Sequence, residues 1–128
     1  MTSRRSAVKS LVALLAAACD STIARLKGRT VVAIARLDEV PRDSAFRKTV
    51  GDQPYIVVND KGDVRTFLAV CTHEGCPLGW NPTQHLIRCP CHGSAFDMRG
   101  RVVQGPAKDP LTEVQTFVER GTVSIVSS

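Results

Sequence analysis

Two short segments in the second half of the chain carry most of its metal-ligating side chains. Six cysteine and histidine residues lie in them: Cys71, His73, Cys76, Cys89, Cys91 and His92. The chain has only 128 residues, of which 5% are aromatic, and a chain of this size buries only about two-thirds of its unfolded surface. Because so small a chain with few aromatic residues can form only a small apolar core, a cross-link or a bound metal would stabilise its fold. We therefore expect these side chains to govern both the local fold and the chemistry.

The spacing of these side chains does not fit an ordinary zinc site. Zinc takes four nitrogen or sulfur ligands, usually in pairs separated by two to four residues. Here six candidates compete, and the arrangement Cys89-x-Cys91-His92 does not match that of a zinc finger. A zinc-stabilised binding module stays open as the alternative without redox chemistry.

The arrangement Cys71-x-His73 and Cys89-x-x-His92, with fifteen residues between the two pairs, resembles the Rieske [2Fe–2S] family. In that family two cysteines hold one iron and two histidines hold the other. The resemblance implies one [2Fe–2S] cluster, with Cys71 and Cys89 on the inner iron and His73 and His92 on the outer iron. Neutral imidazole ligands raise the reduction potential to roughly −150 to +300 mV, from about −400 mV with thiolates alone. The free ring nitrogens couple electron uptake to proton uptake, as a quinol oxidant requires.

The resemblance implies further roles around the cluster. Cys76 and Cys91 match the pair that forms a disulfide in the quinol-oxidising branch of the family. Ser94 matches a serine whose hydroxyl donates a hydrogen bond to a bridging sulfide, which raises the potential. Phe96 stands where high-potential members carry a tyrosine. We therefore expect a potential below that of the tyrosine-bearing relatives.

A segment rich in glycine and proline follows the two cysteine–histidine segments. It contains Gly105, Pro106 and Pro110. It resembles the third loop of the family, which covers the cluster. The family's loops imply a cluster-binding part at about residues 71–111.

The remaining sequence predicts an all-β fold. Short β-branched runs alternate with glycine- and proline-containing turns, a pattern typical of a small sandwich or barrel. We expect a small antiparallel sandwich or barrel of the Rieske type over residues 30–128, with the cluster-binding part built of loops. Three elements are expected: a strand at 31–35, a hairpin joining 55–58 to 64–70, and a hairpin joining 114–118 to 123–126 through Arg120 and Gly121.

The N-terminal segment has the features of an export signal. Arg4, Arg5 and Lys9 precede an apolar run that ends in small residues, and the paired arginines resemble a twin-arginine signal. The nine uninterrupted residues from 10 to 18 would form about 14 Å of helix, less than half of the roughly 30 Å of a hydrocarbon core. We expect residues 1–18 to be the signal and residues 19–29 a linker. Cys19 is expected to be a lipidated N-terminus, as in a bacterial lipobox.

The net charge does not point to nucleic acid. The formal charge is +5, and residues 1–18 contribute three of these positive charges. The rest of the chain holds 14 basic and 12 acidic residues, and its basic residues are not interleaved with aromatics. We expect no nucleic-acid partner.

The leading functional hypothesis is the iron–sulfur subunit of a quinol-oxidising cytochrome bc-type complex. Its implied partners are a cytochrome b, a c-type cytochrome and quinol, at the outer face of the cytoplasmic membrane or in the periplasm. Glu74 weakens this hypothesis, because quinol-oxidising members usually have leucine there and burying a carboxylate at a docking tip costs desolvation energy. The rival is a periplasmic carrier or a small subunit of a molybdenum enzyme such as arsenite oxidase. A cytosolic dioxygenase-type ferredoxin fits less well, because it lacks the signal and the disulfide cysteines. We interpret His85 as a solvated loop residue and Trp80 and Met98 as packing residues.

Overall fold

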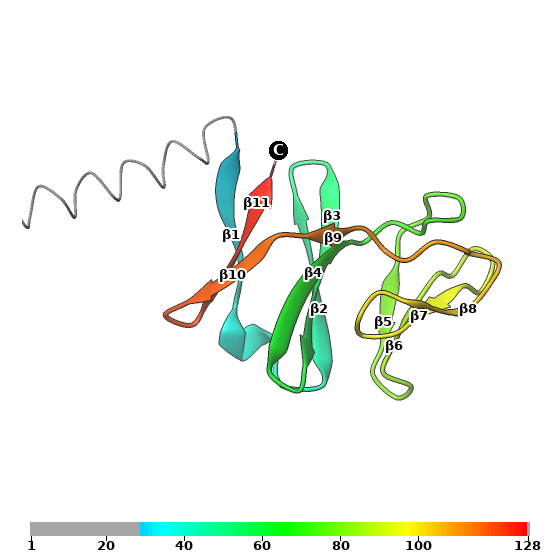
Figure 1. Ribbon diagram of the computed structural model, residues 1–128, viewed down its shortest axis with the longest axis horizontal. Helices are drawn as coiled ribbons and strands as arrows, with labels where there is room; N and C mark the ends of the chain where they lie inside the picture. The colour runs from blue at the N-terminus through cyan, green and yellow to red at the C-terminus, as the bar shows by residue number, and fades with distance from the viewer. Residues whose placement is uncertain (1–28, 128) are drawn as a thin grey trace, which may run out of the picture. The chain divides into compact units, whose positions relative to one another are not determined.

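The computed structural model describes residues 29–127, and these form three antiparallel sheets. The first sheet has the order β1-β11-β10, the second β2-β3-β4-β9 and the third β5-β6-β7-β8 (Figure 1). The expected export signal at 1–18 and the expected lipidation site Cys19 lie outside the described residues. Within 29–127, no helix is long and apolar enough to cross a membrane.

The strands are short, and one 3-10 helix joins the first two. Their bounds are β1 Thr30–Arg36, η1 Leu37–Glu39, β2 Ser44–Val50, β3 Gln53–Asp60, β4 Asp63–Leu68, β5 Gly79–Asn81, β6 Leu86–Arg88, β7 Ala95–Phe96, β8 Val102–Gln104, β9 Glu113–Val114, β10 Thr116–Glu119 and β11 Thr122–Ser127. The all-β prediction is confirmed.

Both expected hairpins are present. Lys61 and Gly62 connect β3 to β4, and Arg120 and Gly121 connect β10 to β11; all four have positive φ. Two-residue turns with positive φ match the twist of antiparallel strands, which is why a glycine at the second position indicates a hairpin. One boundary was wrong: Val114 belongs to β9, which pairs with β4 in the second sheet.

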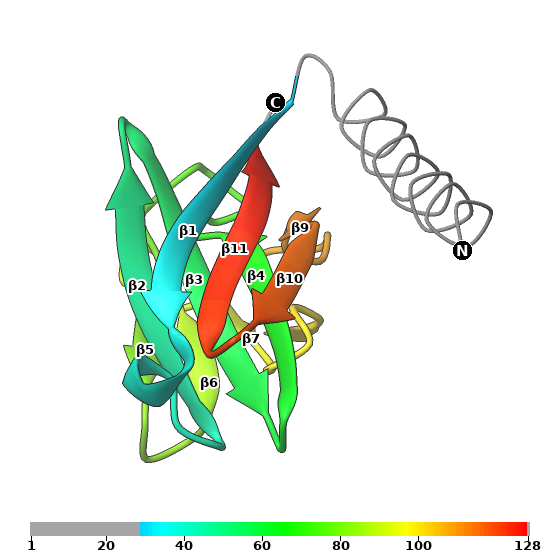
Figure 2. The same ribbon diagram turned by 90° about the vertical axis from the view of Figure 1, so that its left-hand side faces the viewer.

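The second sheet is covered on both faces. On β3, Tyr55 and Val57 point into one apolar core, which also contains Val123 and Ile125 of β11. Ile56 and Val58 point into a second core, which contains residues of the cluster-binding part. Successive side chains of a strand point to opposite faces, so a strand between two cores is apolar at every position. Figure 2 shows the first sheet in front of the second, seen along this stacking direction.

A buried asparagine joins β3 to the segment before β2. Asn59 is 5% exposed, and its side-chain amide donates to the carbonyl of Val40 at 2.8 Å. Its side-chain oxygen accepts the N–H of Gly62 at 2.8 Å, and its backbone carbonyl accepts the N–H of Asp43 at 2.7 Å. The polar atoms of this buried side chain are thereby satisfied.

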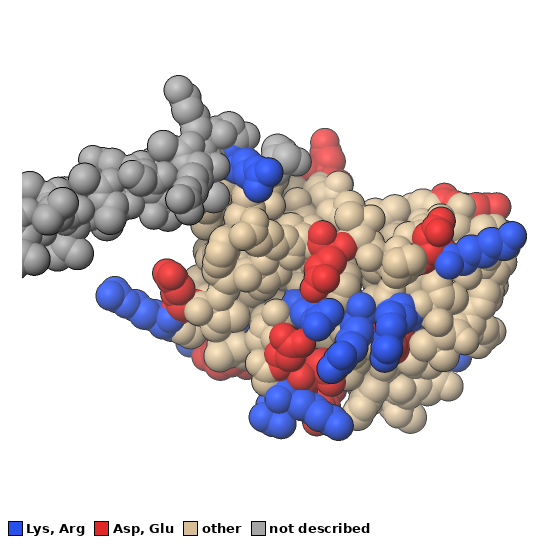
Figure 3. All heavy atoms as spheres, viewed as in Figure 1, with Lys and Arg blue, Asp and Glu red and all other residues tan. Residues whose placement is uncertain are grey.

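The expected cluster-binding part, about residues 71–111, contains strands as well as the expected loops. Its loops extend from the third sheet, whose strands have only two or three residues each. Trp80 and Met98 pack against or within the adjoining core, as predicted. On the face shown in Figure 3, acidic and basic side chains lie next to one another. Ion pairs among the described residues include Arg99–Asp60 and Arg101–Asp97.

Candidate metal centre

The first cysteine–histidine segment forms a closed turn after β4. The N–H of Cys71 donates to the carbonyl of Cys76 at 2.8 Å, and the N–H of Gly75 donates to the carbonyl of Cys71 at 2.8 Å. Gly75 has φ +74°, a conformation that glycine adopts without strain. This turn buries the Cys71 side chain and leaves that of His73 exposed.

The second segment repeats this backbone pattern after β6. The N–H of Cys89 donates to the carbonyl of Ser94 at 2.8 Å, and the N–H of Gly93 donates to the carbonyl of Cys89 at 3.1 Å. Gly93 has φ +80°. In both turns a cysteine donates to the residue five positions later and accepts from a glycine four positions later. The two segments are therefore structurally equivalent loops, each with a buried cysteine and an exposed histidine, here His92.

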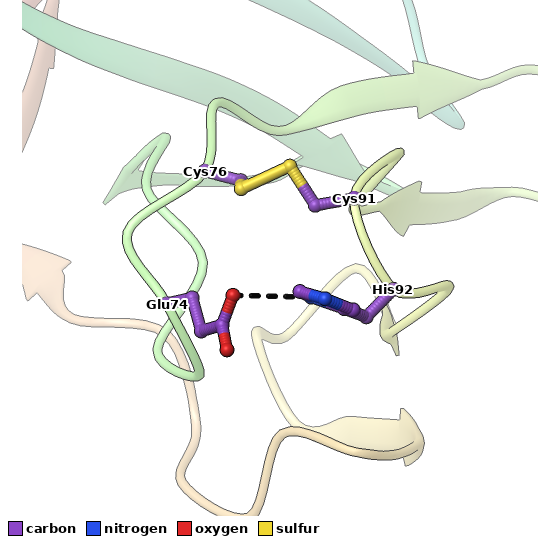
Figure 4. Close-up of a disulfide and its surroundings, with 4 residues drawn as sticks. All are labelled: Glu74, Cys76, Cys91 and His92. Atoms are coloured by element: carbon purple, nitrogen blue, oxygen red, sulfur yellow. Dashed lines mark ion pairs between the residues drawn. A yellow bond between two sulfur atoms is a disulfide. The ribbon is translucent and has the colours of Figure 1, made fainter.

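A disulfide joins the two loops. Cys76 is bonded to Cys91, with 6.4 Å between their Cα atoms, as the family resemblance implied. Figure 4 shows this bond beside Glu74 and His92. The sulfur of Cys89 lies within 4.8 Å of both disulfide sulfurs. The bridge therefore ties the loops together directly beside one of the two remaining cysteines.

The side chains that remain form an inner and an outer pair. Cys71 and Cys89 are free thiols and only 3% exposed. His73 and His92 are exposed, and their ring centroids are 5.3 Å apart with the rings nearly perpendicular. Two buried thiols and two exposed imidazoles, carried by two loops that a disulfide joins, match the donor set of a [2Fe–2S] centre that has one iron on sulfur and one on nitrogen. The residues present therefore fit the group.

A carboxylate lies at the exposed end of this arrangement. The Glu74 Oε2 atom is 3.4 Å from the His92 Nδ1 atom, as the dashed line in Figure 4 marks. Ligand atoms of His73, Glu74 and His92 all lie within 4.8 Å of one another. We call these three residues the tip. Sequence reasoning identified Glu74 as polar but did not predict its contact with His92.

The expected covering segment is hydrogen-bonded to both loops. The N–H of Ala107 donates to the Oγ atom of Ser94 at 3.0 Å, and the Thr72 hydroxyl donates to the carbonyl of Asp109 at 2.7 Å. Ser94 and Ala107 are buried. Because the Ser94 oxygen accepts this bond, its hydroxyl proton stays free to donate to another acceptor. Sequence reasoning missed Thr72 and Ala107, since Thr72 acts through a distant backbone group and Ala107 through its own N–H.

The glycine and proline residues of the covering segment are exposed, and its C-terminal end is held by a hydrogen bond. Gly105, Pro106 and Pro110, the residues that identified it in the sequence, are all exposed. Leu111 is buried, and its N–H donates to the carbonyl of Gly100 at 2.8 Å. The covering segment is thereby attached to the turn that follows β7.

Asp97 organises that turn. Its carboxylate accepts the N–H groups of Arg99 and Arg101, each at 2.9 Å, and the Arg101 guanidinium at 2.7 Å. Partial burial alone would raise the pKa of Asp97, but these hydrogen bonds from Arg101 and Arg99 outweigh it and leave the pKa below its ordinary value.

Phe96 and His85 complete the predicted set. Phe96 is fully buried on β7, in the same core as Cys71 and Cys89. His85 lies in the exposed turn between β5 and β6, as expected of a loop residue. Its ring stacks on that of Trp80, with centroids 6.1 Å apart and 9° between the planes.

Comparisons with known proteins agree with this geometry. A family profile described as the Rieske [2Fe-2S] domain matches residues 30–118. The cytochrome b6-f complex iron-sulfur subunit of Chlorobaculum tepidum is 31% identical over 94 residues, 73% of this chain and 52% of the relative. That of Prochlorococcus marinus is 48% identical over 77 residues, 59% of this chain and 43% of the relative. The chain thus spans about half the length of these curated relatives.

A solved structure shares the fold. The cyanobacterial plasma membrane Rieske protein PetC3 from Synechocystis PCC 6803 matches with a TM-score of 0.63 and 26% identity, covering 73% of this chain and 97% of that one. The profile match, the paired loops, their disulfide and the two pairs of free ligands decide against a zinc-stabilised module. The chain belongs to the Rieske [2Fe–2S] family, and its cofactor is one [2Fe–2S] cluster.

Proposed function

We propose that the chain transfers single electrons as the iron–sulfur subunit of a quinol-oxidising cytochrome bc-type complex. In this proposal Cys71 and Cys89 hold the inner iron, and His73 and His92 hold the outer iron. The observation that carries it is that two loops joined by a disulfide each present a buried free thiol and an exposed imidazole. An electron donor can reach the imidazole end from solvent while the sulfur end stays dry. The relatives named as cytochrome b6-f complex subunits support the same assignment.

The cluster supplies a centre that gains and loses one electron at a time. The residues of this chain supply its surroundings. The exposed rings of His73 and His92 can exchange protons with solvent or with a bound quinol, whereas the burial of Cys71 and Cys89 excludes water from the sulfur side. The Ser94 oxygen accepts the N–H of Ala107, so in this proposal its hydroxyl proton is free to donate to a sulfide of the cluster.

The disulfide favours this branch of the family. Cys76 and Cys91 form a bridge that the dioxygenase-type ferredoxins lack according to the resemblance, and the bridge holds the two loops at a fixed separation. A rigid pair of loops reduces the rearrangement that accompanies electron transfer. This supports a bc-type subunit over a dioxygenase-type ferredoxin.

One observation favours a second candidate. Glu74 is 55% exposed at its side chain and contacts His92, so the tip is polar. A polar tip suits a periplasmic electron carrier, or the small subunit of a molybdenum enzyme of the arsenite-oxidase type, better than it suits an apolar quinol pocket, because burying a carboxylate costs desolvation energy.

The sequence supports a location outside the cytoplasm. Arg4 and Arg5 fit a signal that exports folded, cofactor-loaded proteins, and Cys19 fits a lipid anchor on the outer face of the membrane. We expect Cys19→Ser to release the protein from membranes and to remove fatty-acid label. Replacement of both arginines by lysine should retain the protein in the cytoplasm.

The test is to purify the complex from its native membrane through an affinity tag on this chain. The proposal expects b-type haem to copurify and quinol:cytochrome c oxidoreductase activity to be present. His92→Ala should abolish both this activity and the paramagnetic resonance signal of the reduced cluster, whereas His85→Ala should leave both unchanged. Copurification of molybdenum without haem would favour the second candidate.

A further inference from the structure

Three sulfur atoms lie close together where the two loops meet. The sulfurs of Cys76, Cys89 and Cys91 are all within 4.8 Å of one another. Cys76 and Cys91 are bonded to each other (Figure 4), whereas Cys89 is a free thiol. Cys71 is the other free thiol among residues 29–127, and it lies outside this group. The two free thiols therefore differ, because only Cys89 is a close neighbour of both sulfurs of the bridge.

Burial directs the reactivity of Cys89 toward this bridge. Cys89 is 3% exposed, so dissolved thiols and oxidants reach its sulfur poorly. Its backbone is held by the hydrogen bonds with Ser94 and Gly93 at the turn after β6. Two groups held side by side in one molecule react faster than the same groups in solution, because the entropy of bringing them together is already lost. The bridge is therefore the nearest reaction partner of this thiol.

The surroundings of the bridge indicate which of its sulfurs is attacked. Cys91 is exposed and Cys76 is half-buried. Exchange is faster when the leaving sulfur is more stable as a thiolate, and water stabilises a thiolate at an exposed position. A bond between Cys89 and Cys91 would also close a tight ring over Pro90, whose own ring fixes its φ angle. Attack on Cys76 with release of Cys91 is therefore favoured.

We propose that the disulfide rearranges whenever Cys89 is not bonded to iron. The Cys89 sulfur attacks the Cys76 sulfur, so that a Cys76–Cys89 bond forms and the Cys76–Cys91 bond breaks. The proton that Cys89 loses ends on the Cys91 sulfur. One disulfide and one thiol are consumed and one of each is formed, so the exchange needs no oxidant and no reductant.

This exchange prevents a chain that has lost its cluster from taking up another. The consequence rests on the proposed function, in which Cys89 holds the inner iron. While the Cys89 sulfur is bonded to iron it cannot attack, so the cluster preserves the Cys76–Cys91 bridge. Once the cluster is lost, the new bond occupies the Cys89 sulfur and removes one of the four ligands. The two loops remain joined, but the metal centre is incomplete.

The first test maps the disulfide in the full chain without measuring electron transfer. All samples carry Cys19→Ser, so that the cysteines of the two loops are the only ones present. The cluster is stripped from the purified holoprotein with acid and EDTA, and iron and sulfide are removed by gel filtration in acid. The chain is then returned to mildly alkaline pH without oxygen. At intervals, samples are unfolded and alkylated with N-ethylmaleimide, and their peptides are identified by mass spectrometry.

We expect label to move from Cys89 to Cys91 with time, while Cys71 stays labelled throughout. Holoprotein kept under the same conditions should show a change at least several-fold smaller. A Cys89 that keeps its label, or a Cys89–Cys91 bond, would overturn the proposal. Entry of Cys71 into disulfides as often as Cys89 would also overturn it, because it would indicate random exchange in an unfolded chain.

Two serine variants compare the free thiols directly. Cys71 and Cys89 are each 3% exposed, so the two substitutions are matched in burial. Each removes a cluster ligand under the proposed function, so both variants are isolated without a cluster. We expect part of the Cys71→Ser molecules to contain the Cys76–Cys89 bond, and Cys89→Ser to contain only the Cys76–Cys91 bond. If the Cys76–Cys91 bond is the only one in both variants, the proposal is wrong.

Reconstitution tests the consequence for the cluster. A stripped chain that is incubated before iron and sulfide are added should regain several-fold less visible absorbance than a chain reconstituted at once. Reduction with dithiothreitol before reconstitution should abolish this difference. Equal recovery in a chain with a mapped Cys76–Cys89 bond would overturn the block on reloading. A purified chain that never holds iron would instead refute the proposed function, a result on which the mapping of the two serine variants does not depend.

Discussion

Gly100 lies where the ring of Phe67 leaves no room for a side chain. A Cβ atom at this position would be 2.6 Å from Cε1 and 3.0 Å from Cδ1 of Phe67. Phe67 is fully buried in the core next to the metal centre, so it cannot move aside into solvent. Gly100 also has φ +78°, which an alanine adopts only with strain. Gly100→Ala therefore combines two penalties.

The two penalties can be separated with a matched variant. Gly121 has φ +74°, and a Cβ there would meet nothing within 4 Å. Gly121→Ala should cost only the left-handed conformation, about 1–2 kcal/mol of unfolding free energy. Gly100→Ala should cost this amount and a further 1–3 kcal/mol, roughly, for overpacking. The total for Gly100→Ala is then about 2–5 kcal/mol.

The assay is urea unfolding of the holoprotein followed by far-ultraviolet circular dichroism, with the visible absorbance of the cluster as a second reading. Because the carbonyl of Gly100 accepts the N–H of Leu111, a shifted turn should loosen the covering segment. Bleaching should therefore be faster in Gly100→Ala than in Gly121→Ala. Equal losses of stability in the two variants would refute the steric part of this reasoning.

Four further changes test other parts of the structure. Replacing both Cys76 and Cys91 with alanine opens a bridge of sequence separation 15 and should lower the unfolding free energy by about 3 kcal/mol, measured by urea unfolding. Phe96→Tyr should raise the midpoint potential in a redox titration, because it adds a hydrogen-bond donor in the core that contains both free cysteines. Thr66→Val should raise the thermal midpoint, since the buried Thr66 hydroxyl has no hydrogen-bond partner among residues 29–127. Asp97→Asn should destabilise the protein at pH 7 in urea unfolding. Because the pKa of Asp97 is lowered in the folded protein, its carboxylate stabilises the fold above its unfolded pKa, and this stabilisation is lost as the pH falls through its folded pKa. The difference in unfolding free energy between the variant and the unmodified protein should therefore shrink below about pH 4.

For each of these four predictions, one outcome would contradict the reasoning. An unchanged unfolding midpoint after loss of the disulfide would show that the loops are held by other contacts. A lower or equal potential in Phe96→Tyr would place the new hydroxyl away from the cluster sulfurs. A less stable Thr66→Val would indicate that the threonine hydroxyl does form a hydrogen bond. A pH-independent effect of Asp97→Asn would show that the charge of Asp97 does not contribute to stability.

The sequence predicted the elements that local chemistry determines. The Lys61-Gly62 and Arg120-Gly121 turns indicate hairpins in the sequence. Both positions of such a turn require positive φ, which glycine adopts readily. The two loops and the Cys76–Cys91 bridge were expected from the family resemblance of the cysteine–histidine segments, and the disulfide is present. Strand β2 was missed, because the sequence Ser44–Val50 carries exposed basic residues at an edge and lacks an apolar alternation.

Other features depend on contacts that no local pattern encodes. The strands of the third sheet have two or three residues, too few to show a period. Val114 continues an apolar run in the sequence but pairs with Thr66 in another sheet. The bond from Thr72 to Asp109 joins residues 37 positions apart, and only the folded chain brings them together.

The double-sided burial of β3 raises the question of what keeps its pairing in register. A one-residue slip normally carries apolar side chains into water, but here it would exchange Tyr55 and Val57 for Ile56 and Val58, which are equally apolar. Hydrophobicity alone therefore cannot distinguish the two alignments. The side-chain amide of Asn59 distinguishes them. If β3 shifted by one residue, this buried amide would lose its hydrogen bonds with Val40 and Gly62. One buried polar side chain therefore favours a single register for a strand that lies between two apolar cores.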